Sequence, residues 1–219
     1  MTSLEFKQTA DHIHDICQRL HRRNMLAAAD GNISVRLKDD LIMITPSGVS
    51  KAFMQPQDMV LMNLKGEAIQ GVPSSEKLMH LTVFQKCPQA HCVIHAHPVT
   101  ATAWSIAQPH LEKLPSEALS EVILATGGIP FVPYARPGTQ AMGDVLNLFL
   151  PQYRALILRR HGALAWGESI EEAYRGMERI EHSAQVLMAA HQLGGITALP
   201  DNEIQYLYEM RKKIGETLL

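Results

Sequence analysis

Two histidines separated by a single residue stand inside an otherwise apolar segment, and this pair constrains the fold more than any other feature of the chain. The segment is CVIHAHP, residues 92–98, whose apolar residues are typical of a buried β-strand that ends at Pro98. Side chains two residues apart in a strand point to the same face, with Cα atoms roughly 6–7 Å apart. His95 and His97 are therefore well placed to converge on one ion, and poorly placed to be two solvated surface residues.

A shared metal ion is one interpretation of this pair, and hydrogen-bonded core histidines are the other. Neutral imidazole is a common zinc ligand, and catalytic zinc sites combine three protein ligands with one open position. His161 is the best candidate for the third ligand, because it lies in a second apolar segment (155–167) and Gly162 allows close backbone approach. His91 faces the same way but lies about 13 Å from His95, too far to share the ion. The histidines expected at the surface are His12, His14, His21, His110, His182 and His191.

Composition and charge exclude several classes of partner. With 219 residues the chain can bury a full core, and we expect one domain over residues 1–219. A net charge of −2 and an aromatic fraction of 5% argue against nucleic acid and membrane partners. The N-terminal sequence lacks the apolar core of a signal peptide, and the chain has no apolar run of about 18 residues. Three cysteines without paired spacing (Cys17, Cys87 and Cys92) indicate reduced thiols, so we expect a soluble, cytoplasmic protein.

The order of the predicted elements indicates an α/β fold. Strands are expected within residues 33–37, 41–45, 58–64 and 92–96, and around a kink at residues 161–162. Helices are expected over residues 3–24, 72–87, 98–107, 139–150 and 169–194, and from Asp201 onward. Strands in hairpin-like succession, wrapped by helices, predict a three-layer α/β/α domain with a central, mainly antiparallel sheet.

Three short polar turns are candidates for an anion site. They are GNIS (31–34), TPSGVSK (45–51) and PSSE (73–76). Such segments present backbone N–H groups and hydroxyls, and a helix N-terminus adds a favourable dipole. Taken singly, each is explained as a β-turn or a helix start. A phosphate cradle requires the three turns to meet in space, with Lys51 or Arg36 adding positive charge.

Two acidic residues are candidates for proton transfer. Glu76 falls in the first turn of a predicted helix, where the helix dipole favours a carboxylate whatever its function. A general base must reach the proton that it removes, which depends on the tertiary structure. Glu121 lies in the otherwise apolar stretch SEALSEVIL and is equally consistent with a surface position.

Six segments of the chain, in order, resemble the class II aldolase/adducin family, and especially its bacterial sugar-phosphate aldolases of the fuculose-1-phosphate type. They are GNISVRL, ITPSGVSK, PSSEKLMH, VIHAHP, VPYARPGT and HGALAWG, over roughly residues 25–190. The resemblance implies an α/β/α fold on a largely antiparallel sheet. It also implies a C4 homotetramer with active sites between subunits and one zinc ion (Zn²⁺) per subunit.

The same resemblance implies a role for each candidate residue. The zinc ligands would be His95, His97 and His161, and the catalytic glutamate would be Glu76. The residues that match the family's phosphate loops are Gly31, Asn32, Ser47, Gly48, Ser74 and Ser75. In the fuculose aldolases the usual proton donor is a tyrosine of the neighbouring subunit. This chain has no tyrosine in SEALSEVILATGG, and Glu121 lies near the expected position.

The activity that the resemblance implies is zinc-dependent retro-aldol cleavage of a ketose 1-phosphate to dihydroxyacetone phosphate and an aldehyde. Substrates that fit are 5-deoxyribulose, 5-methylthioribulose and fuculose 1-phosphate. Two enzymes of the same family are alternatives. One is a methylthioribulose-1-phosphate dehydratase, because those enzymes resemble this chain in having a glutamate in the region of Glu121, although they lack an equivalent of Glu76. The other is a ribulose-5-phosphate 4-epimerase. A non-catalytic, adducin-like interaction module is the third alternative, and the three histidines with Glu76 argue against it.

Overall fold

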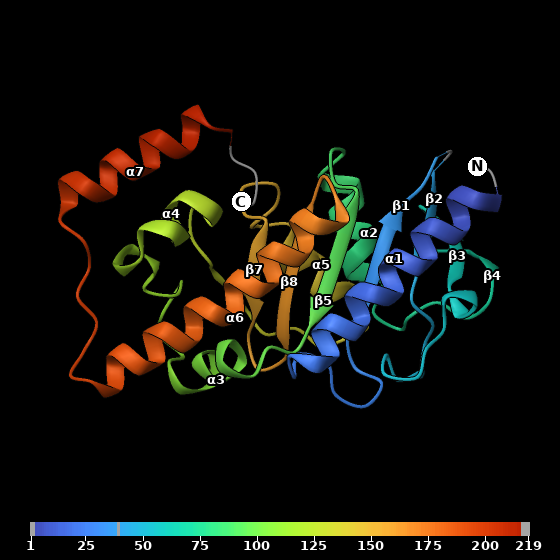
Figure 1. The fold of residues 1–219 in the computed structure, drawn as a ribbon, viewed down its shortest axis with the longest axis horizontal. Helices are drawn as coiled ribbons and strands as arrows, with labels where there is room; N and C mark the ends of the chain where they lie inside the picture. The colour runs from blue at the N-terminus through green and yellow to red at the C-terminus, as the bar shows by residue number, and fades with distance from the viewer. Residues whose placement is uncertain (1–2, 39, 216–219) are drawn as a thin grey trace.

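A mixed eight-stranded sheet forms the centre of the molecule (Figure 1), in a computed structural model that describes residues 3–38 and 40–215. The spatial order of the strands is β4-β3-β2-β1-β5-β8-β7-β6. Every neighbouring pair is antiparallel except β6 and β7, which are parallel. The strands are β1 (Asn32–Arg36), β2 (Leu41–Ile44), β3 (Val60–Asn63), β4 (Ala68–Gln70), β5 (Cys92–Ala96), β6 (Phe131–Val132), β7 (Ala155–Leu158) and β8 (Gly162–Gly167). The predicted mainly antiparallel sheet is confirmed.

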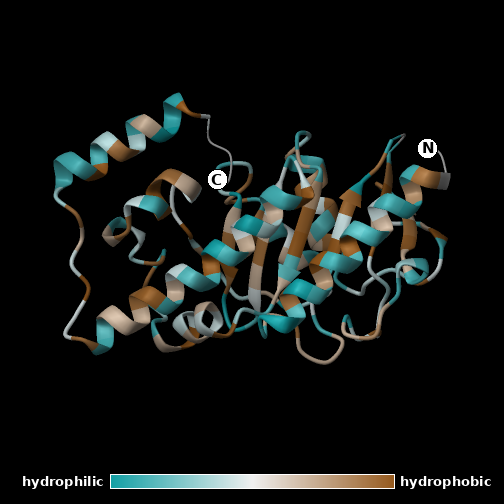
Figure 2. Ribbon diagram, in the orientation of Figure 1, coloured by the Kyte–Doolittle hydropathy of each residue, from teal (hydrophilic) through white to brown (hydrophobic). Residues whose placement is uncertain are grey.

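Helices cover both faces of this sheet and complete the three predicted layers. One face packs against α1 (Ser3–Arg22), α3 (Val99–Ala107) and α6 (Ile170–Gln192). The other face packs against α2 (Lys77–Lys86) and α5 (Gln140–Leu146). In Figure 2 the middle strands are largely hydrophobic, whereas α1 and α6 alternate hydrophobic and hydrophilic residues along their length, as expected for helices with one buried side.

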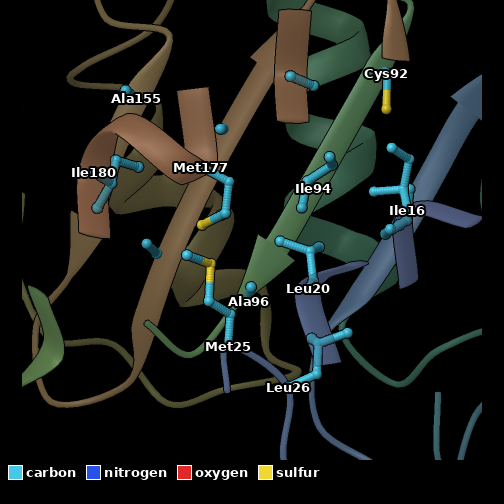
Figure 3. Close-up of a cluster of buried hydrophobic side chains, with 14 of the residues drawn as sticks. Ile16, Leu20, Met25, Leu26, Cys92, Ile94, Ala96, Ala155, Met177 and Ile180 are labelled. Carbon is cyan, nitrogen blue, oxygen red and sulfur yellow. The ribbon is translucent and has the colours of Figure 1, made fainter. Parts of the chain in front are cut away.

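The first of these interfaces is built by residues that alternate along the strands. Figure 3 shows Ile94 of β5 in the same cluster as Leu20 of α1 and Met177 of α6, and all three are buried. Val93, the preceding residue of β5, belongs to the opposite core beneath α2 and α5. This period of two is what the apolar pattern of the segment predicted.

Two helices lie beyond the edge of the sheet. Helix α7 (Asp201–Lys213) packs on α4 (Ser120–Thr126) and follows an extended segment that leaves α6 (Figure 1). The buried Arg211 of α7 donates through Nη1 to the carbonyl of Leu124, 2.6 Å away, near the end of α4. In the part of the chain that the structure describes, two 3₁₀ helices complete the secondary structure, Pro56–Asp58 and Ser116–Ala118. Over the described residues, no helix combines the length and the apolar character needed to cross a membrane.

Most predicted helices begin close to their expected residues. Ser169 stands at the predicted start of α6 and caps this helix, with its side chain accepting a hydrogen bond from the backbone N–H of Glu172. Helix α2 starts later than predicted, because Ser74 forms a turn with its hydroxyl accepting the N–H of Glu76. Helix α5 covers only the first part of residues 139–150, and turns ahead of Pro151 replace the remainder. That residues 1–219 form one domain stays a prediction.

Strands β1, β5 and β8 are neighbours in the middle of the sheet, and their register brings the site residues together where these strands begin or end. Asn32 of β1 lies opposite His95 of β5, and His95 lies opposite Leu164 of β8. His161 occupies the turn between β7 and β8, directly before Gly162. A Cβ atom on Gly162 would lie only 2.4 Å from the carbonyl oxygen of Ala96, so the close backbone approach expected at this glycine is confirmed.

Candidate functional site

Three histidine rings converge where β5 ends and β8 begins. The ring centroids of His95 and His161 lie 4.6 Å apart, those of His95 and His97 lie 4.9 Å apart, and those of His97 and His161 lie 5.2 Å apart. One potential ligand atom from each ring falls within 4.8 Å of the other two. In the part of the chain that the structure describes, this is the one cluster of three or more histidine, cysteine or acidic residues with that geometry.

The hydrogen bonds of these rings fit a bound metal ion. Nδ1 of the fully buried His95 lies 2.9 Å from the carbonyl oxygen of Ala163, so Nδ1 donates and Nε2 keeps a free lone pair. Burial, with the neighbouring His95 and His161, lowers the pKa of His97 to about 4, which keeps its ring neutral. The Nε2 atoms of His95 and His97 lie 3.0 Å apart, near the roughly 3.3 Å that separates two nitrogen ligands on a tetrahedral zinc ion. The donor set therefore fits a divalent metal ion.

A carboxylate lies against two of the three rings. Oε1 of Glu76 is 3.1 Å from Nε2 of His161, and Oε2 is 3.3 Å from Nε2 of His95. Oε2 also accepts a hydrogen bond of 3.1 Å from Nδ2 of Asn32. Burial alone would raise the pKa of Glu76, but hydrogen bonds and charge interactions with His161 and His95 outweigh it and hold this pKa below its usual range. The Glu76 carboxyl group therefore lies within contact distance of two of the three metal-ligand candidates.

The three polar turns meet in space, as a phosphate cradle requires. A backbone bridge pairs Pro46 with Pro73, and a pocket of about 580 Å³ opens between these turns and the histidines. Ala29, Asp30, Pro137 and Gly138 contribute to its wall. The predicted site residues that line it are Gly31, Asn32, Ser47, Gly48, Ser74, Ser75, Glu76, His97 and His161. The six residues predicted for phosphate binding thus share one pocket with Glu76, and their binding of phosphate stays a prediction.

The donors that face this pocket follow from the backbone pairing of the turns. The N–H groups of Ser47 and Ser74 donate to the carbonyls of Val72 and Thr45, so these two groups are already engaged. The hydroxyl of Ser74 accepts the N–H of Glu76 and still has its own proton to donate to an anion. Gly48 has a φ of +70°, a left-handed conformation that an L side chain rarely adopts, so the turn depends on glycine there.

Lys51, rather than Arg36, supplies the positive charge at this pocket. Its Nζ donates to the carbonyls of Ala29 and Val49, at 2.8 and 3.0 Å, and its side chain is buried. Burial lowers the pKa of Lys51 from its ordinary value. Arg36 is directed elsewhere, with Nη2 donating to the carbonyl of Phe84 and the guanidinium stacked over the Phe84 ring. Of the two residues considered for this charge, Lys51 is therefore the one that lines the pocket.

His80 is a buried polar residue that the sequence analysis missed. Its Nδ1 lies 2.6 Å from the hydroxyl of Ser34, its Nε2 contacts Oδ1 of Asn32, and its side chain has no solvent exposure. Its position one helical turn after Glu76 is the sequence signal that could have found it, because such residues share a helix face.

Among the predicted site residues, Glu121 is the one that neither lines the pocket nor belongs to the histidine cluster within a single chain. It lies in the first turn of α4, exposed to solvent, and Oε2 accepts a hydrogen bond of 3.1 Å from the hydroxyl of Ser120. A role in the reaction therefore requires a second copy of the chain, which is the arrangement that the sequence analysis expected for the proton donor.

A three-layer α/β/α fold with a three-histidine centre and an adjacent carboxylate defines a metal-dependent enzyme. The chain belongs to the class II aldolase and adducin family, because the sequence model of the "Class II Aldolase and Adducin N-terminal domain" matches residues 11–188. Similarity to proteins named as aldolases identifies it as a lyase of the aldolase type, which argues against the non-catalytic, adducin-like alternative.

Three relatives illustrate this similarity. The L-fuculose phosphate aldolase of Escherichia coli (strain K12) is 31% identical over 216 residues, which cover 97% of this chain and 98% of the relative. The 3-oxo-tetronate 4-phosphate decarboxylase of the same organism is 30% identical over 198 residues, 88% of this chain and 87% of the relative. The crystal structure of L-fuculose-1-phosphate aldolase from Thermus thermophilus has a TM-score of 0.75 at 30% identity, covering 87% of this chain and 97% of that one.

Proposed function

We propose that the protein catalyses retro-aldol cleavage of a ketose 1-phosphate, with zinc bound by His95, His97 and His161. The products are dihydroxyacetone phosphate and an aldehyde, and the substrate is 5-deoxyribulose, 5-methylthioribulose or fuculose 1-phosphate. The observation that carries this proposal is the position of Glu76, which touches His95 and His161 at the wall of a pocket rich in hydroxyls and N–H groups.

The side chains divide the reaction between binding and proton transfer. When bound, a divalent metal ion supplies Lewis-acid stabilisation of negative charge that develops on the substrate oxygens. Breaking the C3–C4 bond removes the C4 hydroxyl proton and adds a proton at C3. Glu76 delivers the proton to C3. The polar turns hold the phosphate, and this binding aligns the reacting carbons. Glu121 of a second copy faces the C4 oxygen in this scheme.

The test is a panel of ketose 1-phosphates assayed for product. Release of dihydroxyacetone phosphate with an equimolar aldehyde supports the aldolase. A dehydratase instead forms a diketo phosphate with an intact carbon chain, and an epimerase forms an isomer without free aldehyde. Purified protein that converts none of the sugar phosphates to dihydroxyacetone phosphate contradicts the proposal.

Decarboxylation is a second candidate, favoured by the 30% identity to 3-oxo-tetronate 4-phosphate decarboxylase. This reaction also breaks a carbon–carbon bond beside a carbonyl group, so the same metal-ligand candidates and phosphate pocket serve it. Adding a 3-oxo acid phosphate to the panel and measuring carbon dioxide release separates it from the aldolase.

Substituting Ser47 or Ser75 by alanine is expected to raise KM more than it lowers kcat. Each hydroxyl lost from a charged phosphate should cost about 1.5–3 kcal/mol, which corresponds to roughly 10–150-fold in affinity. Steady-state kinetics and inhibition by inorganic phosphate measure the effect. Unchanged affinity in both variants moves the phosphate site away from these turns.

A homotetramer is the oligomeric state that we propose, and it predicts complementation between inactive variants. Light scattering at micromolar concentration should give a molar mass four times that of one chain.

The Glu76→Gln and Glu121→Gln proteins, each impaired alone, should regain activity when they are mixed and allowed to exchange subunits. Some sites then combine an intact Glu76 with an intact Glu121 from the neighbouring copy. A fully active monomer contradicts the assembly, and an active Glu121→Gln variant removes that residue from the mechanism.

A further inference from the structure

A chain of hydrogen-bonded side chains runs from the interior of the protein to Glu76. The hydroxyl of Ser34 contacts Nδ1 of His80 at 2.6 Å, Nε2 of His80 contacts Oδ1 of Asn32, and Nδ2 of Asn32 donates to Oε2 of Glu76 at 3.1 Å. Ser34, His80 and Asn32 are all buried. Two elements supply the chain, because Asn32 and Ser34 share one face of β1 while Glu76 and His80 lie one turn apart at the start of α2.

The chemistry of these groups gives the chain one direction. Asn32 turns Nδ2 toward Oε2 of Glu76 and Oδ1 toward Nε2 of His80, so its amide donates to the carboxyl group and accepts from the ring. Since Oδ1 only accepts, Nε2 of His80 must carry the proton. In a neutral ring Nδ1 is then an acceptor, and the Ser34 hydroxyl donates to it. Burial, with a smaller contribution from His95, lowers the pKa of His80 to about 3, which keeps the ring neutral.

We propose that His80 is a positioning residue for the reaction: its Nε2–H holds the Asn32 amide in the one orientation that donates to Glu76. The amide in turn holds Oε2 of Glu76 beside His95. Without a donor at this point the Asn32 amide is free to turn over and present its oxygen to the carboxylate, which repels it. The inference deepens the proposed function, because it relies on the role of Glu76 in proton transfer.

Paired substitutions separate the hydrogen bond of His80 from its bulk. His80→Phe keeps an aromatic ring and removes both nitrogens, whereas His80→Gln keeps an N–H near the position of Nε2. Thr82→Val is the matched control, because Thr82 is also buried on α2 but bonds only to the Leu78 carbonyl of its own helix.

We expect His80→Phe to lower kcat by about 10–100-fold, the range for a lost hydrogen bond to a charged network. KM and the inhibition constant of inorganic phosphate should change less than about threefold, with metal content unchanged, because the pocket stays intact. His80→Gln should recover kcat to within about threefold of the unsubstituted enzyme, and Thr82→Val should match it. The proposal is overturned if His80→Gln does not restore the kcat that His80→Phe loses. It is also overturned if the affinity for phosphate falls in proportion to kcat.

A spectroscopic measurement decides the orientation without any turnover. Long-range ¹H–¹⁵N spectra of the histidine rings should show His80 as the neutral Nε2–H tautomer from about pH 6 to 8. The side-chain amide signal of Asn32 should move in His80→Phe and stay in place in His80→Gln. An Nδ1–H tautomer, or an Asn32 amide unaffected by His80→Phe, overturns the proposal even in an active enzyme. Failure of the substrate panel alone, with these spectra as expected, counts instead against the proposed function.

Discussion

Replacing Glu76 by glutamine is expected to lower kcat by about 10²–10⁴-fold, the usual contribution of a positioned acid–base group. Glutamine keeps the size and the hydrogen bond from Asn32, but it cannot transfer a proton to or from C3 of the substrate. The metal should stay bound, because His95, His97 and His161 remain. Dihydroxyacetone phosphate release and metal content, measured on the same preparation, check both expectations.

Glu67→Gln is a matched control for this change. Glu67 lies in the exposed turn between β3 and β4, where it accepts a hydrogen bond from Asn63, and its variant should behave like the unsubstituted enzyme. A Glu76→Gln enzyme that cleaves the substrate at a normal rate refutes the proposed role of Glu76. If Glu121→Gln at the same time abolishes loss of water from an intact carbon chain, the dehydratase alternative is correct.

Replacing His95 by alanine is expected to remove metal and activity together. His95 is fully buried, its Nδ1 is engaged by the Ala163 carbonyl, and its Nε2 faces His97 and Glu76. Two histidines remain in the variant, fewer than the three protein ligands usual for catalytic zinc. Elemental analysis should find about one metal ion per chain in the unsubstituted protein and a small fraction of that in the variant.

His91→Ala is the matched control for His95→Ala. His91 directly precedes β5 on the same strand segment but is exposed at the far end of the strand, so its variant should keep both metal and activity. A metal-free preparation with full activity, or a His95→Ala variant that still holds one ion per chain, contradicts the proposed metal site.

Local patterns in the sequence were enough to predict several elements. The apolar run around His95 and His97 predicted strand β5 and the convergence of the two rings. The structure has strand β5, which ends at Ala96, and the ring centroids of His95 and His97 lie 4.9 Å apart. Ser169 predicted the start of α6, because a helix cap depends only on residues within one turn. The polar turns could be recognised as turns for the same reason.

The meeting of these elements depends on contacts that local patterns do not encode. Asn32, Ser34 and Arg36 alternate with apolar residues on β1, a pattern that is typical of a strand with one solvated face. In the structure that face packs against α2, where Asn32 and Ser34 bond to His80 and Arg36 bonds to Phe84. A polar face covered by a helix and one exposed to water have the same alternation.

The chain by itself determined which residues are candidates for the chemistry, since their types and short-range spacing are local properties. It predicted His95, His97 and Glu76 as candidates, and the resemblance supported them. Only the tertiary structure decided that Glu76 lies between His95 and His161, and that His80 and Asn32 hold it. The reason is that the register of β1 on β5 and the docking of α2 are set by burial of two apolar cores, to which residues throughout the chain contribute.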